Sequence, residues 1–379
     1  MLLLEKRTEP YGGVMKIFYV FVLLAFILVY SSPTLSEYKA YPGLELVSPQ
    51  YIEIRDNVII TNMPQVRDQG GLPICIAAAS SLIIEQATCR KDRTDCRRLP
   101  DDQRPSILDL MRFNYHGDLE WRQSDPGAYP KKIYMRPDDY GLHIMMNIFH
   151  GMAVVPESCA PSSSFILKNS DGEQLIKLEV QTWDRLQMVY DHYRKVFRKC
   201  RTCADEIAKA GILEFRAIFS PSTDVAQEKT AFSAESYESF LSKFLIPDRC
   251  YSGNYYYVRH NNYDWWPDED RNVEYGEVIS KIIEILKSGQ PIYAAVCLAD
   301  VPGRTTCTEN GEERGHALVI TGFQKMCNGS DCVDALRVEN TWGPDWQAEY
   351  ANGWIRARPL LTHLGFGRAS LFWVQAPMR

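Results

Sequence analysis

A run of small and apolar residues between Pro73 and Ala87 limits the folds that are open to this chain. Wound as a helix, the run PICIAAASSLIIEQA is apolar on nearly every face, and its alanines and serines let neighbouring segments come close. Pro73 suits the first turn of a helix, where its missing N–H needs no partner. The run therefore predicts a buried helix that carries Cys75 at its start.

The patterns along the rest of the chain place helices first and strands last. We expect short helices at residues 105–113 and 141–150, and a helix-to-strand unit at 276–299. Strand-like segments follow at 316–324, 335–342, 352–359 and 370–375. Segregated helices and strands predict an α+β fold.

Residues 160–275 differ from their surroundings. They contain an amphipathic helix pattern at 182–210 and an aromatic-rich stretch at 254–266 with no clear period. We interpret the region as an inserted subdomain. Its aromatic stretch is open to two interpretations, a surface that contacts carbohydrate or peptide, and packing of the insert onto the body.

An apolar run of 14 residues at 17–30 follows Met15 and Lys16 and precedes small and polar residues. These are the proportions of a secretory signal, so we assign residues 1–36 to a signal peptide with an upstream extension before Met15. A membrane span needs about 20 apolar residues, and an uncleaved signal that anchors a single-pass protein is the alternative. The expected location is secreted or extracytoplasmic, whether extracellular, periplasmic or lysosome-like.

The charge balance excludes one class of function. A formal net charge of −6 and a pI of about 5.7 argue against a general nucleic-acid binder, which would need a basic face to displace counterions from phosphates. We therefore expect no nucleic-acid partner. The apolar content of 45% supports a globular core of ordinary size.

Eleven cysteines behind a secretory signal predict disulfides, because an exported chain meets an oxidising compartment. Local spacing favours the bridges Cys89–Cys96, Cys327–Cys332 and Cys297–Cys307. Sequence alone cannot pair Cys159, Cys200, Cys203 and Cys250. An odd number of cysteines cannot all form disulfides with one another, so we expect one to remain a thiol. Cys75 is the candidate for that thiol because no other cysteine lies close to it in the sequence.

A cysteine at a helix start is suited to nucleophilic catalysis. The attacking form is the thiolate, and a helix N-terminus or an adjacent imidazolium lowers the thiol pKa from about 8.5. His316 is the best-placed partner among the seven histidines, because it opens the apolar run ALVITGF and so begins a buried strand. Asn340, in VENTWGPDW, is suited to orient the imidazole.

These residues resemble the motifs of the papain-like cysteine peptidases in three separate places. Gln69 and Gly70 precede Cys75 at the family's spacing. The run HALV at 316–319 resembles the histidine segment, and NTWGPDW at 340–346 resembles the motif N-S-W-G-x-x-W. The order is also the family's, and the resemblance spans residues 55–159 and 276–379.

The resemblance implies a role for each residue. Cys75 would be the nucleophile, His316 the general base and later acid, and Asn340 the group that orients the imidazole. Trp342 would shield the hydrogen bond between His316 and Asn340 from water. Gln69 would donate its side-chain amide to the oxyanion of the tetrahedral intermediate, a contact worth about 10²- to 10³-fold in rate.

For the substrate, the resemblance implies three further positions. The backbone of Gly141 would pair with an extended peptide, and Ala295 and Ala317 would line the pocket for the side chain two residues before the cut. A small-walled apolar pocket favours bulky apolar side chains. The resemblance implies no metal and no organic cofactor.

The implied fold has two lobes with an active-site cleft between them. A helical lobe at residues 37–159 would carry the nucleophile, and an antiparallel β-barrel-like lobe at 276–379 would carry the histidine and asparagine. The insert at 160–275 lies between them in sequence, and we hypothesise that it partly covers or reshapes the cleft. We expect a monomer that hydrolyses peptide or protein substrates through a thioester on the cysteine.

The sequence also departs from the family. Leu72 stands where papain has a cysteine that forms a disulfide, and Ile76 replaces the aromatic residue that usually follows the nucleophile. Two other functions therefore stay open, a catalytically silent papain-like protein that binds a peptide or partner, and an acyl transferase that uses the same thioester. Asn328-Gly329-Ser330 is a glycosylation sequon, meaningful only in a eukaryotic secretory route.

Overall fold

The computed structural model describes part of the chain, and all of that part belongs to the unit Tyr41–Arg379 rather than to Met1–Ala40. The described residues are 43–69, 74–111, 144, 153–165, 186–196, 225–252, 256–257, 262–267, 273–298, 308–309, 312–313, 315–364 and 371–375. The predicted signal peptide at 1–36 lies outside them, as do Leu72, Gly141, Cys200 and Cys203. Within them, no helix is long and apolar enough to cross a membrane.

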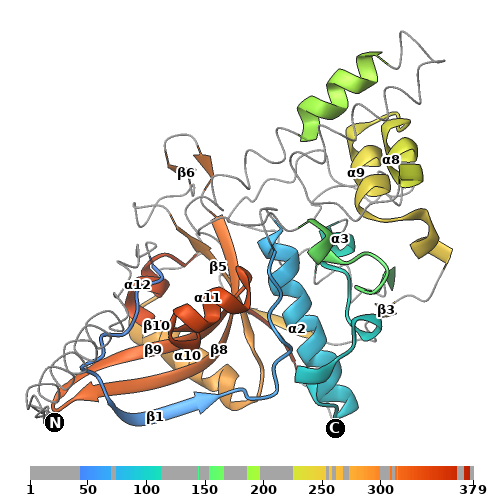
Figure 1. The fold of residues 1–379 in the computed structure, drawn as a ribbon. Helices are drawn as coiled ribbons and strands as arrows, with labels where there is room; N and C mark the ends of the chain where they lie inside the picture. The colour runs from blue at the N-terminus through green and yellow to red at the C-terminus, as the bar shows by residue number, and fades with distance from the viewer. Residues whose placement is uncertain are drawn as a thin grey trace, which may run out of the picture. The chain divides into compact units, whose positions relative to one another are not determined.

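An antiparallel sheet organises the described part of the molecule around one long strand, β8 (Gly315–Asn328). Its first half pairs with β5 (Ile292–Cys297), its second half pairs with β1 (Glu53–Ile59), and β9 (Asp331–Asn340) runs along its other side. The sheet is completed by β10 (Trp354–Arg356), β11 (Leu371–Val374) and β4 (Tyr263–Trp266), in the order β10-β9-β8-β5-β11-β4. Figure 1 labels β10, β9, β8 and β5 of this sheet. Helices and antiparallel strands together give the mixed architecture that the sequence patterns predict.

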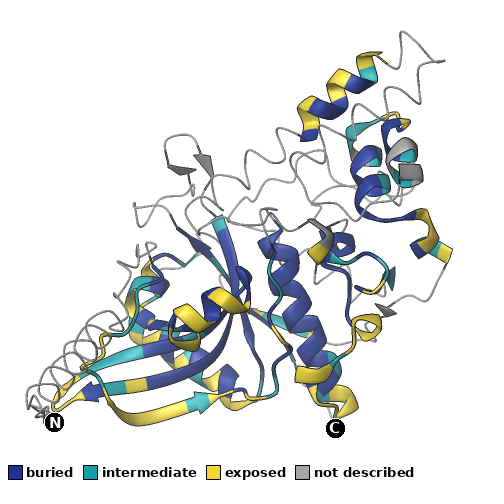
Figure 2. Cartoon of the chain, viewed as in Figure 1, coloured by how far each residue is buried: buried dark blue, intermediate teal, exposed yellow. Residues whose placement is uncertain are grey.

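Helix α2 (Cys75–Asp92) is buried along most of its length, as its sequence predicts, and begins at Cys75. It packs against β8, β5 and β11. Figure 2 shows the helix coloured as buried along most of its length. The alanines and serines near its start allow this close approach. The helix ends at Arg93, which adopts the left-handed conformation with φ 55° and donates its N–H to the carbonyl of Cys89.

The predicted helix-to-strand unit is also present. It consists of α10 (Tyr275–Lys287) and then β5. The helix is amphipathic and buries Ile279, Ile282, Ile285 and Leu286. The turn between them uses Gly289 at φ +76°, a conformation that glycine adopts without strain.

Shorter helices complete this part of the chain. They are α3 (Ile107–Leu110), which Ser106 caps, α11 (Gly343–Glu349) and α12 (Ala357–Thr362). Single 3₁₀ turns lie at Cys96–Arg98, Asp101–Gln103, Ser162–Phe165, Asp248–Ser252 and Ala351–Gly353. The strand expected at 352–359 is wrong in its second half, because β10 ends at Arg356 and the chain continues as α12.

The region 160–275 contributes helices with an aromatic core of their own. Residues 186–196 are helical, and α8 (Val225–Phe232) packs on α9 (Tyr237–Leu245). Their aromatic rings contact one another at centroid distances of 5.0–6.0 Å, through Tyr190, Tyr193, Phe232, Tyr237, Phe240 and Phe244.

The end of the same region joins the body. Strand β3 (Tyr256–Tyr257) pairs with β2 (Ala153–Val154), and β4 pairs with β11 in the main sheet. Tyr263 stacks on Phe372 with ring centroids 5.4 Å apart. For Tyr263, packing onto the body is therefore the interpretation that the contact favours. A separate hairpin is formed by β6 (Thr308–Glu309) and β7 (Glu312–Glu313).

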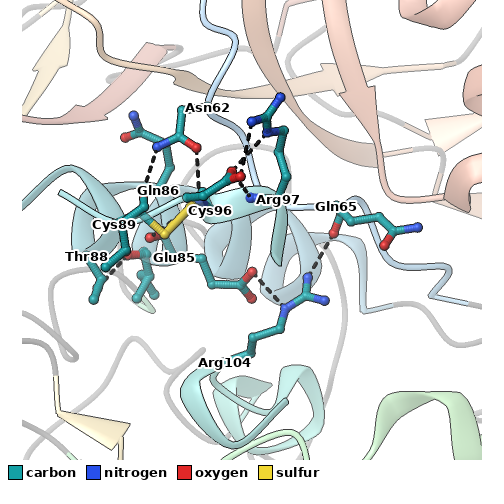
Figure 3. The surroundings of a disulfide bond; sticks show 12 residues. Asn62, Gln65, Glu85, Gln86, Thr88, Cys89, Cys96, Arg97 and Arg104 are labelled. Atoms are coloured by element: carbon teal, nitrogen blue, oxygen red, sulfur yellow. Dashed lines mark hydrogen bonds and ion pairs between the residues drawn. A yellow bond between two sulfur atoms is a disulfide. The ribbon is translucent and has the colours of Figure 1, made fainter. Parts of the chain in front are cut away.

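Two of the predicted disulfides are confirmed, Cys89–Cys96 (Figure 3) and Cys327–Cys332. A third joins Cys159 to Cys250, a pair that sequence could not assign. Cys297 is disulfide-bonded, but its expected partner Cys307 lies outside the described residues. Cys75 carries a thiol, as expected for the residue left over.

Candidate active site

Cys75 is the first residue of α2 and is completely buried. The residue before it, Ile74, is the N-cap and supplies no side-chain hydrogen bond, and the first turn holds no acidic residue. The positive end of the helix dipole therefore acts on the sulfur without a carboxylate nearby on the helix to oppose it. Cys75 belongs to the same buried cluster as Tyr293, Ala317 and Trp342.

His316 and Asn340 meet across two neighbouring strands. His316 is the second residue of β8 and Asn340 the last of β9, and Asn340 lies opposite Leu318 in the ladder. Both side chains therefore project from the same face, two positions apart. The Nε2 atom of His316 lies 2.8 Å from Oδ1 of Asn340, and both residues are buried.

The orientation of the Asn340 amide fixes the tautomer of the imidazole. The backbone N–H of Trp342 donates to Oδ1 of Asn340 at 3.3 Å, which identifies that atom as the oxygen. An oxygen acceptor requires the proton on Nε2 of His316. The other ring nitrogen, Nδ1, therefore carries the lone pair that a general base needs.

Trp342 covers this pair. Its indole stacks on the imidazole of His316 with centroids 4.6 Å apart and planes 28° from parallel. Behind it, Trp346 meets Trp342 edge-on and stacks on Tyr350 at 4.2 Å. Burial lowers the pKa of His316 to about 4, and the hydrogen bond that Nε2 donates to Asn340 only partly opposes this effect. The imidazole is therefore neutral at pH 7, the form that accepts a proton.

Gln69 is joined to the same loop by two hydrogen bonds. Its backbone N–H donates to the carbonyl of Thr341 at 2.9 Å, and the hydroxyl of Thr341 donates to Oε1 of Gln69 at 2.5 Å. With Oε1 engaged as an acceptor, the donor end of the amide, Nε2, is the end that can serve an oxyanion. Sequence reasoning missed Thr341, although its place next to Asn340 in the motif pointed to it.

The segment that carries Gln69 lies so close to the loop after Asn340 that position 343 must be glycine. Asp68 forms an isolated bridge with Trp342, and a Cβ on Gly343 would lie 2.8 Å from Cβ of Asp68. Gly343 also has φ +94°, which other residues rarely adopt. The glycine of the motif therefore lets the glutamine segment lie against the asparagine loop.

Arg67 ties the glutamine segment to α2 from the other side. Its guanidinium contacts Glu85 of α2 at 2.6 Å and Glu157 at 2.8 Å, and it donates to the hydroxyl of Ser81 at 2.9 Å. Arg104 bonds the second oxygen of Glu85 at 3.0 Å (Figure 3). Burial raises the pKa of Glu85, and the two arginines oppose this effect. Sequence reasoning gave no signal for this network, because its members are far apart in the chain.

The two alanines expected in the substrate pocket lie directly opposite each other. Ala295 of β5 pairs with Ala317 of β8, and Ala295 is half-buried while Ala317 is buried. Two residues along β5, Tyr293 lies on the same face of the sheet. Burial raises the pKa of Tyr293, and the charge of a Cys75 thiolate raises it further. Gly141 lies outside the described residues, and within those residues no cluster of three metal-ligating side chains occurs.

Comparison with known proteins adds a weak structural likeness. No protein-family model matches the chain, and no curated protein sequence does. Among solved structures, it is similar to xylellain, a cysteine protease from Xylella fastidiosa, at 14% identity over 89% of this chain and 92% of that one. The TM-score is 0.41. A likeness of that size assigns neither fold nor activity to this chain.

Proposed function

We propose that the chain is a papain-like cysteine peptidase that cleaves peptide bonds through a thioester on Cys75. One observation carries the proposal. His316 and Asn340 form a buried pair at 2.8 Å in which Nε2 holds the proton and Nδ1 remains basic. A base oriented by a third group is what a cysteine nucleophile requires, and the thiol stands at the start of a buried helix that packs on the strand of His316.

The chemistry would proceed in two halves. In the first, Nδ1 of His316 takes the proton of the Cys75 thiol as the sulfur attacks the peptide carbonyl, and the tetrahedral oxyanion accepts hydrogen bonds from Nε2 of Gln69 and the N–H of Cys75. The imidazolium then gives its proton to the leaving amine, and a thioester remains. In the second half, water loses a proton to Nδ1 and attacks the thioester carbonyl. The C–S bond breaks, the acid product leaves, and the imidazolium returns its proton to the sulfur of Cys75.

The finer features of the proposal follow from the sequence resemblance. They are a two-lobed fold with the cleft between residues 37–159 and 276–379, a backbone contact from Gly141 to an extended substrate, and a pocket between Ala295 and Ala317 for an apolar side chain. We further propose a secreted monomer that acts on peptide or protein substrates.

Covalent labelling tests the assignment. Folded protein is treated with a thiol-directed peptidyl epoxide, and the modified residue is located by mass spectrometry. We expect a single adduct on Cys75, lost in Cys75→Ala and strongly slowed in His316→Ala. A small haloacetamide serves as the control for simple accessibility. An adduct on another cysteine, or none, contradicts the proposal and favours a silent binding protein.

A further inference from the structure

We propose that Asn328 is a site of N-linked glycosylation and that its glycan covers an apolar edge of the main sheet. Asn328-Gly329-Ser330 is the single Asn-x-Ser/Thr sequon in the 379 residues. The proposal concerns the far end of β8, rests on the proposed secretion through a eukaryotic route, and does not depend on peptidase activity.

The sequon occupies an open hairpin tip. Asn328 ends β8, Asp331 begins β9, and the two residues between them form the turn, with Gly329 at φ +63°. Asn328, Gly329 and Ser330 are all exposed, and a Cβ added to Gly329 would meet no atom within 4 Å. A bulky hydrophilic group therefore has room at this tip.

The neighbouring strand β1 carries exposed apolar side chains that the glycan would cover. Strand β1 pairs with β8 so that Glu53 lies opposite Cys327 and Ile54 opposite Met326. Continuing that register by one residue places Ile52 beside Asn328. Ile52 is 82% exposed and Ile54 48% exposed.

The outer edge of β1 is open in the part of the chain that the structure describes, since no other strand there pairs with it. An open edge with exposed isoleucines is a template for pairing with other chains. A glycan attached one residue beyond the paired segment would block that approach. It would not disturb the candidate active site, because 12 residues of strand separate Asn328 from His316, about 40 Å at 3.3 Å per residue.

The modification joins Nδ2 of Asn328 to the anomeric carbon of an oligosaccharide carried on a lipid pyrophosphate. The bond from that carbon to the pyrophosphate oxygen breaks, the lipid pyrophosphate leaves with the electron pair, and the amide loses one proton to a base of the transferase. A transferase must close around three consecutive residues. In the folded chain, the Cys327–Cys332 disulfide encloses the sequon.

Contacts from the β1 side restrain the same turn. Arg55 donates to the carbonyl of Gly329 at 2.7 Å, and the hydroxyl of Tyr51 donates to the carboxylate of Asp331 at 2.6 Å. The transfer must therefore precede closure of the disulfide and docking of β1. Glycan occupancy then depends on whether the glycan is transferred to Asn328 before the Cys327–Cys332 disulfide forms.

The site is tested on the full chain expressed in eukaryotic secretory cells, with peptide mapping by mass spectrometry before and after N-glycosidase treatment. We expect a glycan on Asn328 in the native chain and in Ser330→Thr, and its complete loss in Asn328→Gln and Ser330→Ala. The double variant Cys327→Ser/Cys332→Ser should show higher occupancy. Chains retained inside the cells are mapped as well, so glycan occupancy can also be measured for variants that fail to fold and are not secreted. An unmodified Asn328 in both the native chain and the double variant overturns the proposal.

The covering role is tested on the secreted protein by light scattering. Enzymatic removal of the glycan should make aggregation several-fold faster, and Ile52→Ser/Ile54→Ser should abolish that difference. Met188→Ser removes another exposed apolar side chain, 61% exposed, and should leave the difference unchanged. Equal aggregation rates with and without the glycan overturn the covering role.

Discussion

At the scale of single residues, Thr341 sets the direction of the Gln69 amide, because its hydroxyl donates to Oε1 and leaves Nε2 as the donor end. Thr341→Val keeps the shape and removes this donor, so we expect kcat to fall about 5- to 10-fold, the value of one ordinary hydrogen bond. Thr341→Ser should retain activity. In a Gln69→Ala background, already about 10²- to 10³-fold slower, Thr341→Val should cost nothing more. An equal further loss in that background would mean that Thr341 acts independently of Gln69.

The buried imidazole of His316 makes a prediction about acid stability. Its pKa is lowered from 6.5 to about 4 in the folded chain, so between these pH values the unfolded chain binds the proton and the folded chain does not. Stability from this group is therefore complete above pH 6.5 and lost as pH falls toward 4. The loss is roughly 3 kcal/mol, at about 1.4 kcal/mol for each pKa unit.

Urea unfolding from pH 4 to 7 measures this effect, with His316→Gln as the comparison because it removes the titrating group. The native chain should lose more stability than the variant as the pH falls. A difference of opposite sign would mean that the ring is protonated in the folded chain, as in a thiolate–imidazolium pair.

At the scale of elements, buried charges hold the segment before Gln69 to α2 through Arg67. Arg67→Met leaves the buried carboxylates of Glu85 and Glu157 with fewer partners, and breaking a buried pair in this way costs about 3–5 kcal/mol. We expect a large fall in thermal midpoint. The matched control, Arg97→Met, removes an exposed pair with Asp95 and should change the thermal midpoint little. Similar falls in the two variants would show that the buried network does not anchor the segment.

The elements that the sequence predicted are those whose pattern is local. Helix α2 is uniformly apolar and β8 is a continuous buried run, so each could be recognised by itself. Strand β1 has an exposed and largely polar sequence, EIRDNVI, and forms because the second half of β8 offers it an edge. Strand β4 was likewise not predicted within the aromatic stretch, because it forms where β11 offers it an edge.

The residues of the candidate site also divide into those that a local sequence pattern predicts and those that it does not. Its chemical groups could be proposed from three short motifs, and the structure places His316, Asn340 and Trp342 in mutual contact. The ion pair between Arg67 and Glu85, which ties the Gln69 segment to α2, could not be proposed, because an ion pair between distant segments leaves no periodic trace in a sequence.

At the scale of the whole molecule, the Cys159–Cys250 disulfide closes a loop with a sequence separation of 91 residues around most of the region 160–275. Cross-links stabilise by restricting the unfolded chain, more for long loops, which gives about 4–5 kcal/mol here. The Cys327–Cys332 bridge, with a separation of 5, should contribute about 2 kcal/mol. Replacing each pair by serine and measuring urea unfolding should therefore show the larger loss for Cys159→Ser/Cys250→Ser.

Limited proteolysis separates this entropic effect from a local one. If the long bridge acts on the whole unfolded chain, protease resistance of the main sheet and of α8 and α9 should fall together in Cys159→Ser/Cys250→Ser. Cleavage confined to 160–275, with a urea midpoint that matches the Cys327→Ser/Cys332→Ser variant, would instead show that the insert unfolds by itself. In that case the bridge only tethers the insert to the body, and the aromatic core formed by Tyr190, Phe232 and Phe240 would be an independent folding unit.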